Sequence, residues 1–183
     1  MDHERCPACG FDGASFDDAA LLGSLRTLGP RWRTLLDACG EDLRVRPEPE
    51  VWSAIEYASH SRDVTSLHVF GVEQALSLEE PSFPAIDGDA LIQSAAPSYL
   101  DAEPGPVVDG LEKEADLLAT RAEQAGTGVW RRGLSIGGSR MDVRRLLEHA
   151  LHDSIHHLAD VERGLSEIEA CRREGRSRAG PPS

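Results

Sequence analysis

The chain has 183 residues, of which 40% are apolar and 28% are charged, a composition typical of a single globular domain with its own core. Its 32 acidic residues outnumber its 19 basic ones and give a net charge of −13, which excludes the basic surface needed to bind nucleic acid or an anionic membrane. We therefore expect a small-molecule substrate, with no nucleic-acid or membrane partner.

The first segment, residues 1–16, is polar and contains the motif Cys6-Pro-Ala-Cys9-Gly. The residues from Met1 to Cys6 lack the basic-then-apolar plan of a secretory signal, so we expect a cytoplasmic protein with reduced thiols. Cys-x-x-Cys-Gly is half of a zinc-ribbon knuckle. A structural zinc ion needs four ligands, and only Cys39 or Cys171 could complete a cysteine set. The sequence therefore favours a simple pair of thiols here.

Apolar residues at helical spacing predict four long helices. The first extends over about 17–39, and Gly29-Pro30 should kink or split it because proline lacks an amide donor and clashes with the preceding turn. The other three are expected at about 50–78, 107–126 and 142–170, and Asp142 can cap the last of them.

The predicted helices are joined by polar segments of unequal length. The connection between the second and third helices, 79–106, is long and should contain a short helix at about 88–94. Residues 127–140 predict an irregular loop or a short hairpin ending in Gly137-Gly138. The tail 171–183 is rich in Arg, Gly and Pro, and we expect it to be disordered. The fold class is an all-α four-helix bundle over 17–170 with a long second connection.

The last helix carries four histidines and two possible ligand pairs at i, i+4 spacing, which places two side chains on one face. Periodicity chooses between them. The pair Asp153 and His157 lies about 80–120° from the centre of the apolar face. The pair His152 and His156 lies about 140–180° away, on the side expected to face solvent. The residues expected to face the bundle interior are therefore Asp153 and His157.

The second helix offers one histidine, His60, on the same face as Val64 and Leu67. Glu56 is one turn earlier on that face and could accept a hydrogen bond from a ligand or carry a proton. Two imidazoles and a carboxylate suit zinc, nickel or ferrous iron and leave positions open on the ion. The alternative is a set of ordinary hydrogen-bonded core histidines.

Three stretches of the sequence resemble DinB-like proteins of the actinobacterial type, over nearly the whole chain up to about Leu165. They are Cys6-Pro-Ala-Cys9-Gly-Phe-Asp, Val51-Trp-Ser-Ala-Ile-Glu-Tyr-Ala-Ser-His60-Ser-Arg-Asp-Val64 and His149-Ala-Leu-His-Asp-Ser-Ile-His-His-Leu-Ala-Asp-Val161. The resemblance implies a four-helix bundle with a metal held by one residue of the second helix and two of the last. It places these ligands on His60, Asp153 and His157. A register shifted by one residue would use His152 and His156 instead.

The DinB-like superfamily includes thiol-dependent enzymes such as mycothiol-dependent maleylpyruvate isomerase and thiol S-transferases. The resemblance therefore implies a divalent metal, with zinc favoured over nickel or iron, and mycothiol as a co-substrate. We expect a metal-dependent transferase or isomerase acting on a small electrophile, with Glu56 or His152 as proton carrier. The alternatives are a metal-dependent hydrolase and a non-catalytic stress-related or interaction bundle with a vestigial site. A homodimer is compatible with all three.

Overall fold

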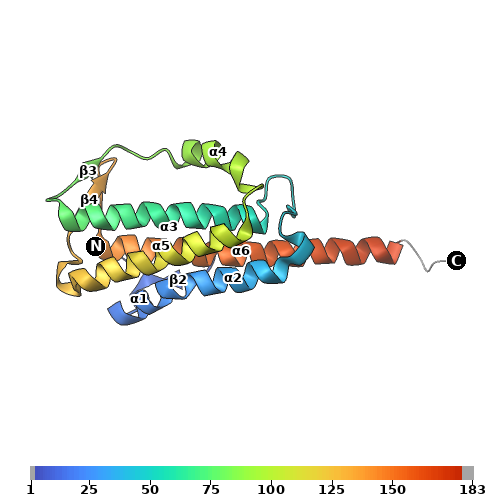
Figure 1. The fold of residues 1–183 in the computed structure, drawn as a ribbon, viewed down its shortest axis with the longest axis horizontal. Helices are drawn as coiled ribbons and strands as arrows, with labels where there is room; N and C mark the ends of the chain where they lie inside the picture. Colours follow the sequence, from blue (N-terminus) through green and yellow to red (C-terminus); the bar gives the residue numbers. More distant parts are fainter. Residues whose placement is uncertain (1–2, 179–183) are drawn as a thin grey trace.

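The structure is a computed structural model that describes residues 3–178, without the side chains of 88–89, 91–93 and 175–178. It is a helical bundle, and the predicted all-α four-helix fold is confirmed (Figure 1). The four positions of the bundle are occupied by α1 (Asp18–Arg26) with α2 (Leu28–Cys39), by α3 (Ala54–Ser77), by α5 (Pro104–Ala125) and by α6 (Val143–Arg178). Helix α3 packs between α5 and α6, and so do α1 and α2 on the other side.

The first bundle position is split in two, as the sequence predicts, although the break falls at Thr27 and not at the proline. Pro30 lies in the first turn of α2, where its missing amide would have no helical partner. A side chain at Gly29 would bring its Cβ within 2.4 Å of the Cβ of Glu112. The glycine is therefore needed for the close approach of α2 to α5.

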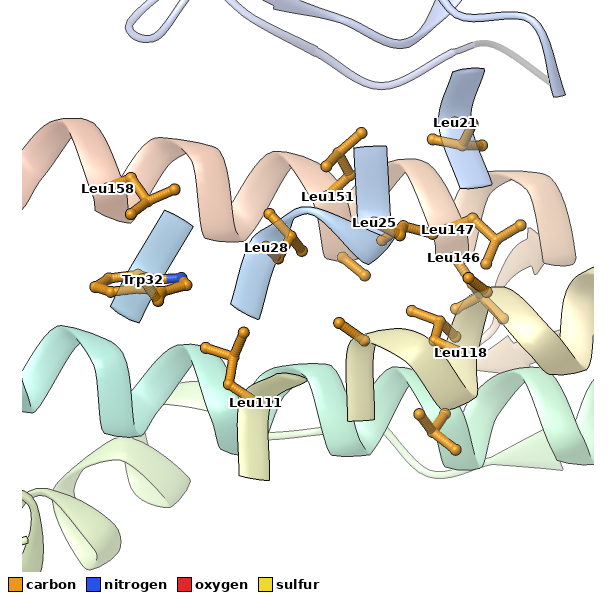
Figure 2. Packing of buried hydrophobic residues seen from close by; sticks show 14 of the residues in the cluster. Leu21, Leu25, Leu28, Trp32, Leu111, Leu118, Leu146, Leu147, Leu151 and Leu158 are labelled. Atoms are coloured by element: carbon orange, nitrogen blue, oxygen red, sulfur yellow. The ribbon is translucent and has the colours of Figure 1, made fainter. Parts of the chain in front are cut away.

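The core is made mainly of leucines, with Trp32 of α2 inserted between α5 and α6 (Figure 2). Trp32 is fully buried, and its indole Nε1–H donates to Ser154 Oγ of α6 at 2.8 Å. Because aromatic and leucine side chains bury large apolar areas, this layer contributes much of the stabilisation of the bundle. It also fixes the rotation of α6, since Ser154 is part of the contact.

The long second connection and the third form a small sheet that the sequence analysis missed in part. Strands β4 (Gly133–Ile136) and β5 (Ser139–Asp142) make a hairpin, and β3 (Ser82–Phe83) joins β4 in parallel. Gly137 and Gly138 form the hairpin turn, with φ of 57° and 83°, rather than its end. The short helix α4 (Gly88–Tyr99) is longer than predicted and includes Pro97.

The last helix begins as predicted and ends later. Asp142 accepts a hydrogen bond from the amide of Arg145 at 2.9 Å and so caps α6. The helix continues to Arg178, where a disordered tail from 171 was expected, and its C-terminal part extends beyond the other helices (Figure 1). Ion pairs of Arg172 with Asp42 and of Arg173 with Glu169 stabilise this extension. Residues 179–183 of the predicted tail lie outside the described part. Among the described helices, none combines the length and apolar character needed to span a bilayer.

Candidate metal centre

Three side chains from α3 and α6 meet between the two helices. One ligand atom each from His60, Asp153 and His157 lies within 4.8 Å of the others, and His157 Nε2 is 3.5 Å from Asp153 Oδ1. The imidazole rings of His60 and His157 are 5.1 Å apart between centroids. The structure thus brings together the three residues that the sequence analysis selected, and their binding of a metal stays a prediction.

A second carboxylate orients one of these ligands. His157 Nδ1–H donates to Asp160 Oδ2 at 3.1 Å, which leaves Nε2 facing Asp153. Asp160 is buried and also forms an ion pair with Arg163. A carboxylate that accepts from the far nitrogen of a metal-binding histidine fixes the tautomer and orientation of the ring. Asp160 is part of the last stretch that resembles DinB-like proteins, but the sequence alone assigned it no role.

The charges in the cluster complement one another. Burial lowers the pKa of His60, so that its imidazole is neutral, the form that binds metals. Burial acts against charge on His157 as well, but its hydrogen bonds to Asp153 and Asp160 raise its pKa overall. For Asp153 the effect of burial is outweighed by His157, and its pKa is lowered. Two nitrogens and one anionic oxygen therefore converge, a donor set that fits a divalent ion.

Aromatic side chains cover the cluster at one end. The ring of Trp52 packs edge-on against His60 at 5.3 Å, and the ring of Tyr57 lies 5.0 Å from that of His157. Trp52 itself is only partly buried. Together the two rings cover this side of the three donors.

A large cavity lies beyond the other end of the cluster. It measures about 810 Å³ and is lined mainly by apolar side chains of α3, β3, β4 and α6. The three cluster residues do not line it, but His68 and His149 do. His149 is one helical turn before Asp153, and His68 is two turns after His60. A molecule in the cavity would therefore lie one to two helical turns from the donors.

His68 is the neutral histidine of the cavity wall. Burial lowers its pKa to about 4. Its Nδ1–H donates to the carbonyl of Val64 at 2.7 Å, because a carbonyl can only accept. The Nε2 atom of His68 is consequently an acceptor.

Glu56 does not take the catalytic role suggested by the sequence. It is fully buried, and Oε2 accepts from the amide and hydroxyl of Ser53 in the capping box that starts α3. The same carboxylate forms an ion pair with Arg46. These partners hold the pKa of Glu56 below its ordinary value, although burial alone would raise it. Glu56 is thus a structural anion, and periodicity could not reveal that its partners come from residues preceding the helix.

The second histidine pair is covered, which corrects the prediction that it faces solvent. The N-terminal hairpin of β1 (Arg5–Cys6) and β2 (Phe11–Asp12) lies across this face of α6. The ring of Phe11 packs 5.3 Å from that of His152, whose side chain is only 16% exposed. Helical periodicity could not predict that the hairpin covers these residues, because the hairpin is more than a hundred residues away in the chain.

The architecture defines a class: a helical bundle with an open three-donor cluster between its second and its last long helix. A family model described as the DinB superfamily matches residues 24–161, and the chain belongs to this superfamily. A solved structure, that of YfiT from Bacillus subtilis, superposes with a TM-score of 0.68 at 16% identity over 86% of this chain and 87% of that chain. YfiT is described as a probable metal-dependent hydrolase with an unusual four-helix bundle topology. A search of curated proteins gave no match.

Replacing Asp160 with asparagine is expected to weaken binding of a divalent ion at the cluster by about 10–100-fold, the usual effect of losing the carboxylate behind a histidine ligand. Competition titration of the metal-free protein with a chelating dye measures the change. Glu162→Gln, which alters an exposed carboxylate on the same helix, is the matched control. Equal affinities for Asp160→Asn and Glu162→Gln would show that Asp160 does not orient His157.

Proposed function

We propose that this protein is a metal-dependent enzyme in which His60, Asp153 and His157 hold one divalent ion, for which zinc is our choice. The observation that carries the proposal is the convergence of three donor atoms within 4.8 Å on two packed helices. Three protein ligands leave at least one position of the ion open, which is typical of catalytic sites rather than structural ones. An ion bound there would lower the pKa of a thiol or water in its open position and so supply a nucleophile at neutral pH.

The leading candidate nucleophile is a low-molecular-weight thiol of the mycothiol type. The enzyme would either transfer this thiol to a small electrophile or use it to isomerise one. The superfamily membership supports this choice. The second candidate is hydrolysis by water, favoured by the likeness to YfiT. In both, the apolar cavity of about 810 Å³ binds the body of the substrate beside the cluster. The net charge of −13 supports a small molecule as partner rather than nucleic acid or a membrane.

The role of proton carrier, which the sequence suggested for Glu56, is taken by residues of the cavity wall. His68 Nε2 accepts a hydrogen bond or a proton from a bound substrate, since its Nδ1 is committed to Val64. His149 Nδ1 lies 3.1 Å from Glu4 Oε2, so that this carboxylate orients the imidazole. Trp52 and Tyr57 cover one side of the donors.

Metal analysis of the full chain, purified without a histidine tag, tests the proposal. His60→Ala should lose one equivalent of ion per chain relative to the wild type, together with its activity. His3→Ala, outside the cluster, should keep both. The loaded protein is then assayed for mycothiol consumption with small electrophiles and for ester or amide hydrolysis without thiol. An ion content unaffected by His60→Ala would overturn the proposal, and the two assays separate transferase from hydrolase.

A further inference from the structure

The N-terminal motif folds into a tight turn between β1 and β2. The amide of Gly10 donates to the carbonyl of Cys6 at 2.9 Å, and Gly10 adopts a φ of 75°, which favours glycine. The turn therefore holds the two cysteine side chains close together at one end of the hairpin.

The turn lies against the covered face of α6. Cys6 Sγ is 3.7 Å from His156 Nδ1. One ligand atom each from Cys6, Cys9, His152 and His156 lies within 4.8 Å of all the others. Cys39 and Cys171, which the sequence analysis considered as completing ligands, are not in this group: Cys39 is buried in α2 and donates to the carbonyl of Leu35, and Cys171 is exposed.

We propose that Cys6, Cys9, His152 and His156 form a second metal site, a structural zinc centre that fastens the N-terminal hairpin to α6. Two thiolates and two imidazoles are a tetrahedral zinc set, and the spacings C-x2-C and H-x3-H are those of such centres. With Zn–S of about 2.3 Å and Zn–N of about 2.0–2.1 Å, tetrahedral geometry separates sulfur from nitrogen by about 3.6 Å. The Cys6–His156 separation of 3.7 Å matches this value.

The state of His152 supports the assignment. Its ring nitrogens are buried, and neither has a hydrogen-bond partner among the residues that the structure describes. Nδ1 is 3.3 Å from Glu4 Oε1, in a direction that does not meet hydrogen-bond geometry. Buried polar atoms without partners are costly. A zinc ion at one of these nitrogens would supply a partner that the protein itself does not give it.

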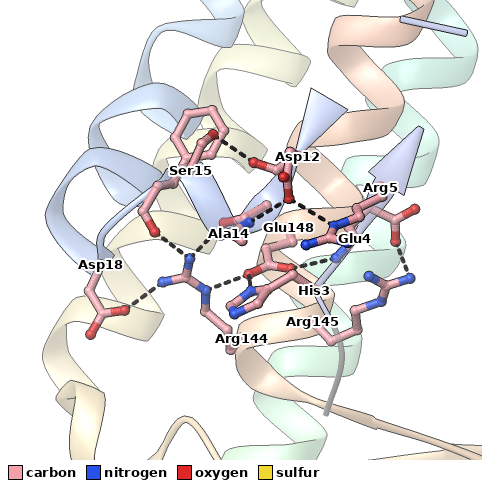
Figure 3. Close-up of polar contacts among 12 residues, drawn as sticks. His3, Glu4, Arg5, Asp12, Ala14, Ser15, Asp18, Arg144, Arg145 and Glu148 are labelled. Atoms are coloured by element: carbon pink, nitrogen blue, oxygen red, sulfur yellow. Dashed lines mark hydrogen bonds and ion pairs between the residues drawn. The ribbon is translucent and has the colours of Figure 1, made fainter. Parts of the chain in front are cut away.

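The hairpin is held in place by contacts other than the ion. The amide of Glu4 donates to Glu148 Oε2 at 2.8 Å, and the Glu4 carboxylate pairs with Arg145 of α6 at 2.6 Å (Figure 3). Phe11 is buried against the bundle. The four ligands are therefore brought together by the fold before any ion binds.

This centre differs in kind from the cluster of His60, Asp153 and His157. Four protein ligands close the coordination shell and leave no position for substrate, whereas three leave the ion open. His152 and His156 precede Asp153 and His157 by one residue each, so the two sites occupy neighbouring faces of the same two turns of α6. The histidine-rich segment of α6 thus supplies ligands to two ions of different function.

Cobalt titration of the metal-free full chain tests the proposal. Cobalt bound by thiolates gives a sulfur-to-metal charge-transfer band in the near ultraviolet. We expect this band in the wild type and in His60→Ala, and its loss in the double variant Cys6→Ser/Cys9→Ser, which should also bind one zinc fewer per chain. Cys171→Ser is the matched control and should keep both band and ion. A wild type without the band, or an unchanged zinc content in the double variant, would overturn the proposal.

A second measurement needs no variant. The reduced wild-type protein is treated with an excess of an alkylating reagent. The extent of alkylation of each cysteine is then measured by mass spectrometry. Cys6 and Cys9 should be protected when zinc is present and react after chelation, while exposed Cys171 reacts in both cases. Equal alkylation of Cys6 and Cys9 with and without chelator would contradict a zinc centre. Because His60→Ala does not affect this readout, failure here is distinguishable from failure of the proposed enzyme function.

Discussion

Replacement of Glu148 by alanine is expected to lower the free energy of unfolding by about 3–5 kcal/mol, the range for breaking a buried charge pair by removing one partner. The Glu148 side chain is 1% exposed and accepts from Arg144 at 2.6 Å, from His3 at 2.7 Å and from the amide of Glu4 at 2.8 Å (Figure 3). Without it, Arg144 loses a buried partner and the amide of Glu4 loses its acceptor. Chemical denaturation followed by circular dichroism measures the difference. Glu162→Ala, an exposed control on the same helix, should change stability by less than about 0.5 kcal/mol.

The pH dependence of stability tests whether the charge of Glu148 is the source of this effect. Burial alone would raise the pKa of Glu148, but Arg144, the amide of Glu4 and His3 lower it below its ordinary value of 4.5. The folded protein therefore releases this proton more readily than the unfolded chain. The advantage of the wild type over Glu148→Ala should be complete above pH 4.5 and decrease as the pH falls below it. An advantage that does not change with pH would show that charge on Glu148 is not its source.

Replacement of Trp32 by alanine should lower the free energy of unfolding by about 3–5 kcal/mol, the usual cost of emptying a fully buried aromatic site. Trp32 has no exposed surface and lies among leucines of α2, α5 and α6 (Figure 2). Thermal and chemical denaturation measure the loss.

The variant Trp32→Phe separates volume from hydrogen bonding at this position. It keeps most of the apolar contact but removes the donor to Ser154 Oγ, a loss of about 1–3 kcal/mol. An equal effect of Trp32→Phe and Trp32→Ala would assign the whole stabilisation to the hydrogen bond, contrary to our expectation. A loss below about 1 kcal/mol for Trp32→Ala would contradict the packing of α2 between α5 and α6.

Helical periodicity was sufficient for the long helices and for the inward direction of His60, Asp153 and His157, because these properties follow from spacing within one element. It could not predict the contacts of residues whose partners are remote in sequence. Glu56 was given a catalytic role because it shares a face with His60, whereas Arg46 and Ser53 engage its carboxylate. The parallel pairing of β3 with β4 was also missed, because the two strands are far apart in the sequence. In addition, each strand is too short to show alternation of polar and apolar residues.

The N-terminal segment shows the same limit most clearly. Its two cysteines were paired in the sequence analysis only with other cysteines, because a knuckle is usually completed by a second knuckle. The structure instead brings them to His152 and His156, which periodicity had placed in solvent. The i, i+4 spacing of those histidines and the C-x-x-C spacing were both visible in the sequence. The contacts that bring the two motifs together, such as the hydrogen bond from the Glu4 amide to Glu148 and the burial of Phe11, are properties of the folded chain.

All three donors of the open cluster lie well inside long helices, His60 in α3 and the other two in α6. Their backbone positions are fixed by helix packing, so most of the entropy lost in arranging the donors is lost during folding and not during metal uptake. The site is therefore preorganised: removing its ion should leave the bundle folded and ready to rebind. The hairpin, by contrast, has strands of two residues each, and an ion there would act as a cross-link that suppresses fraying of the N-terminus. One helix thus contributes ligands to an open site and to a closed site whose ion would hold the hairpin against the bundle.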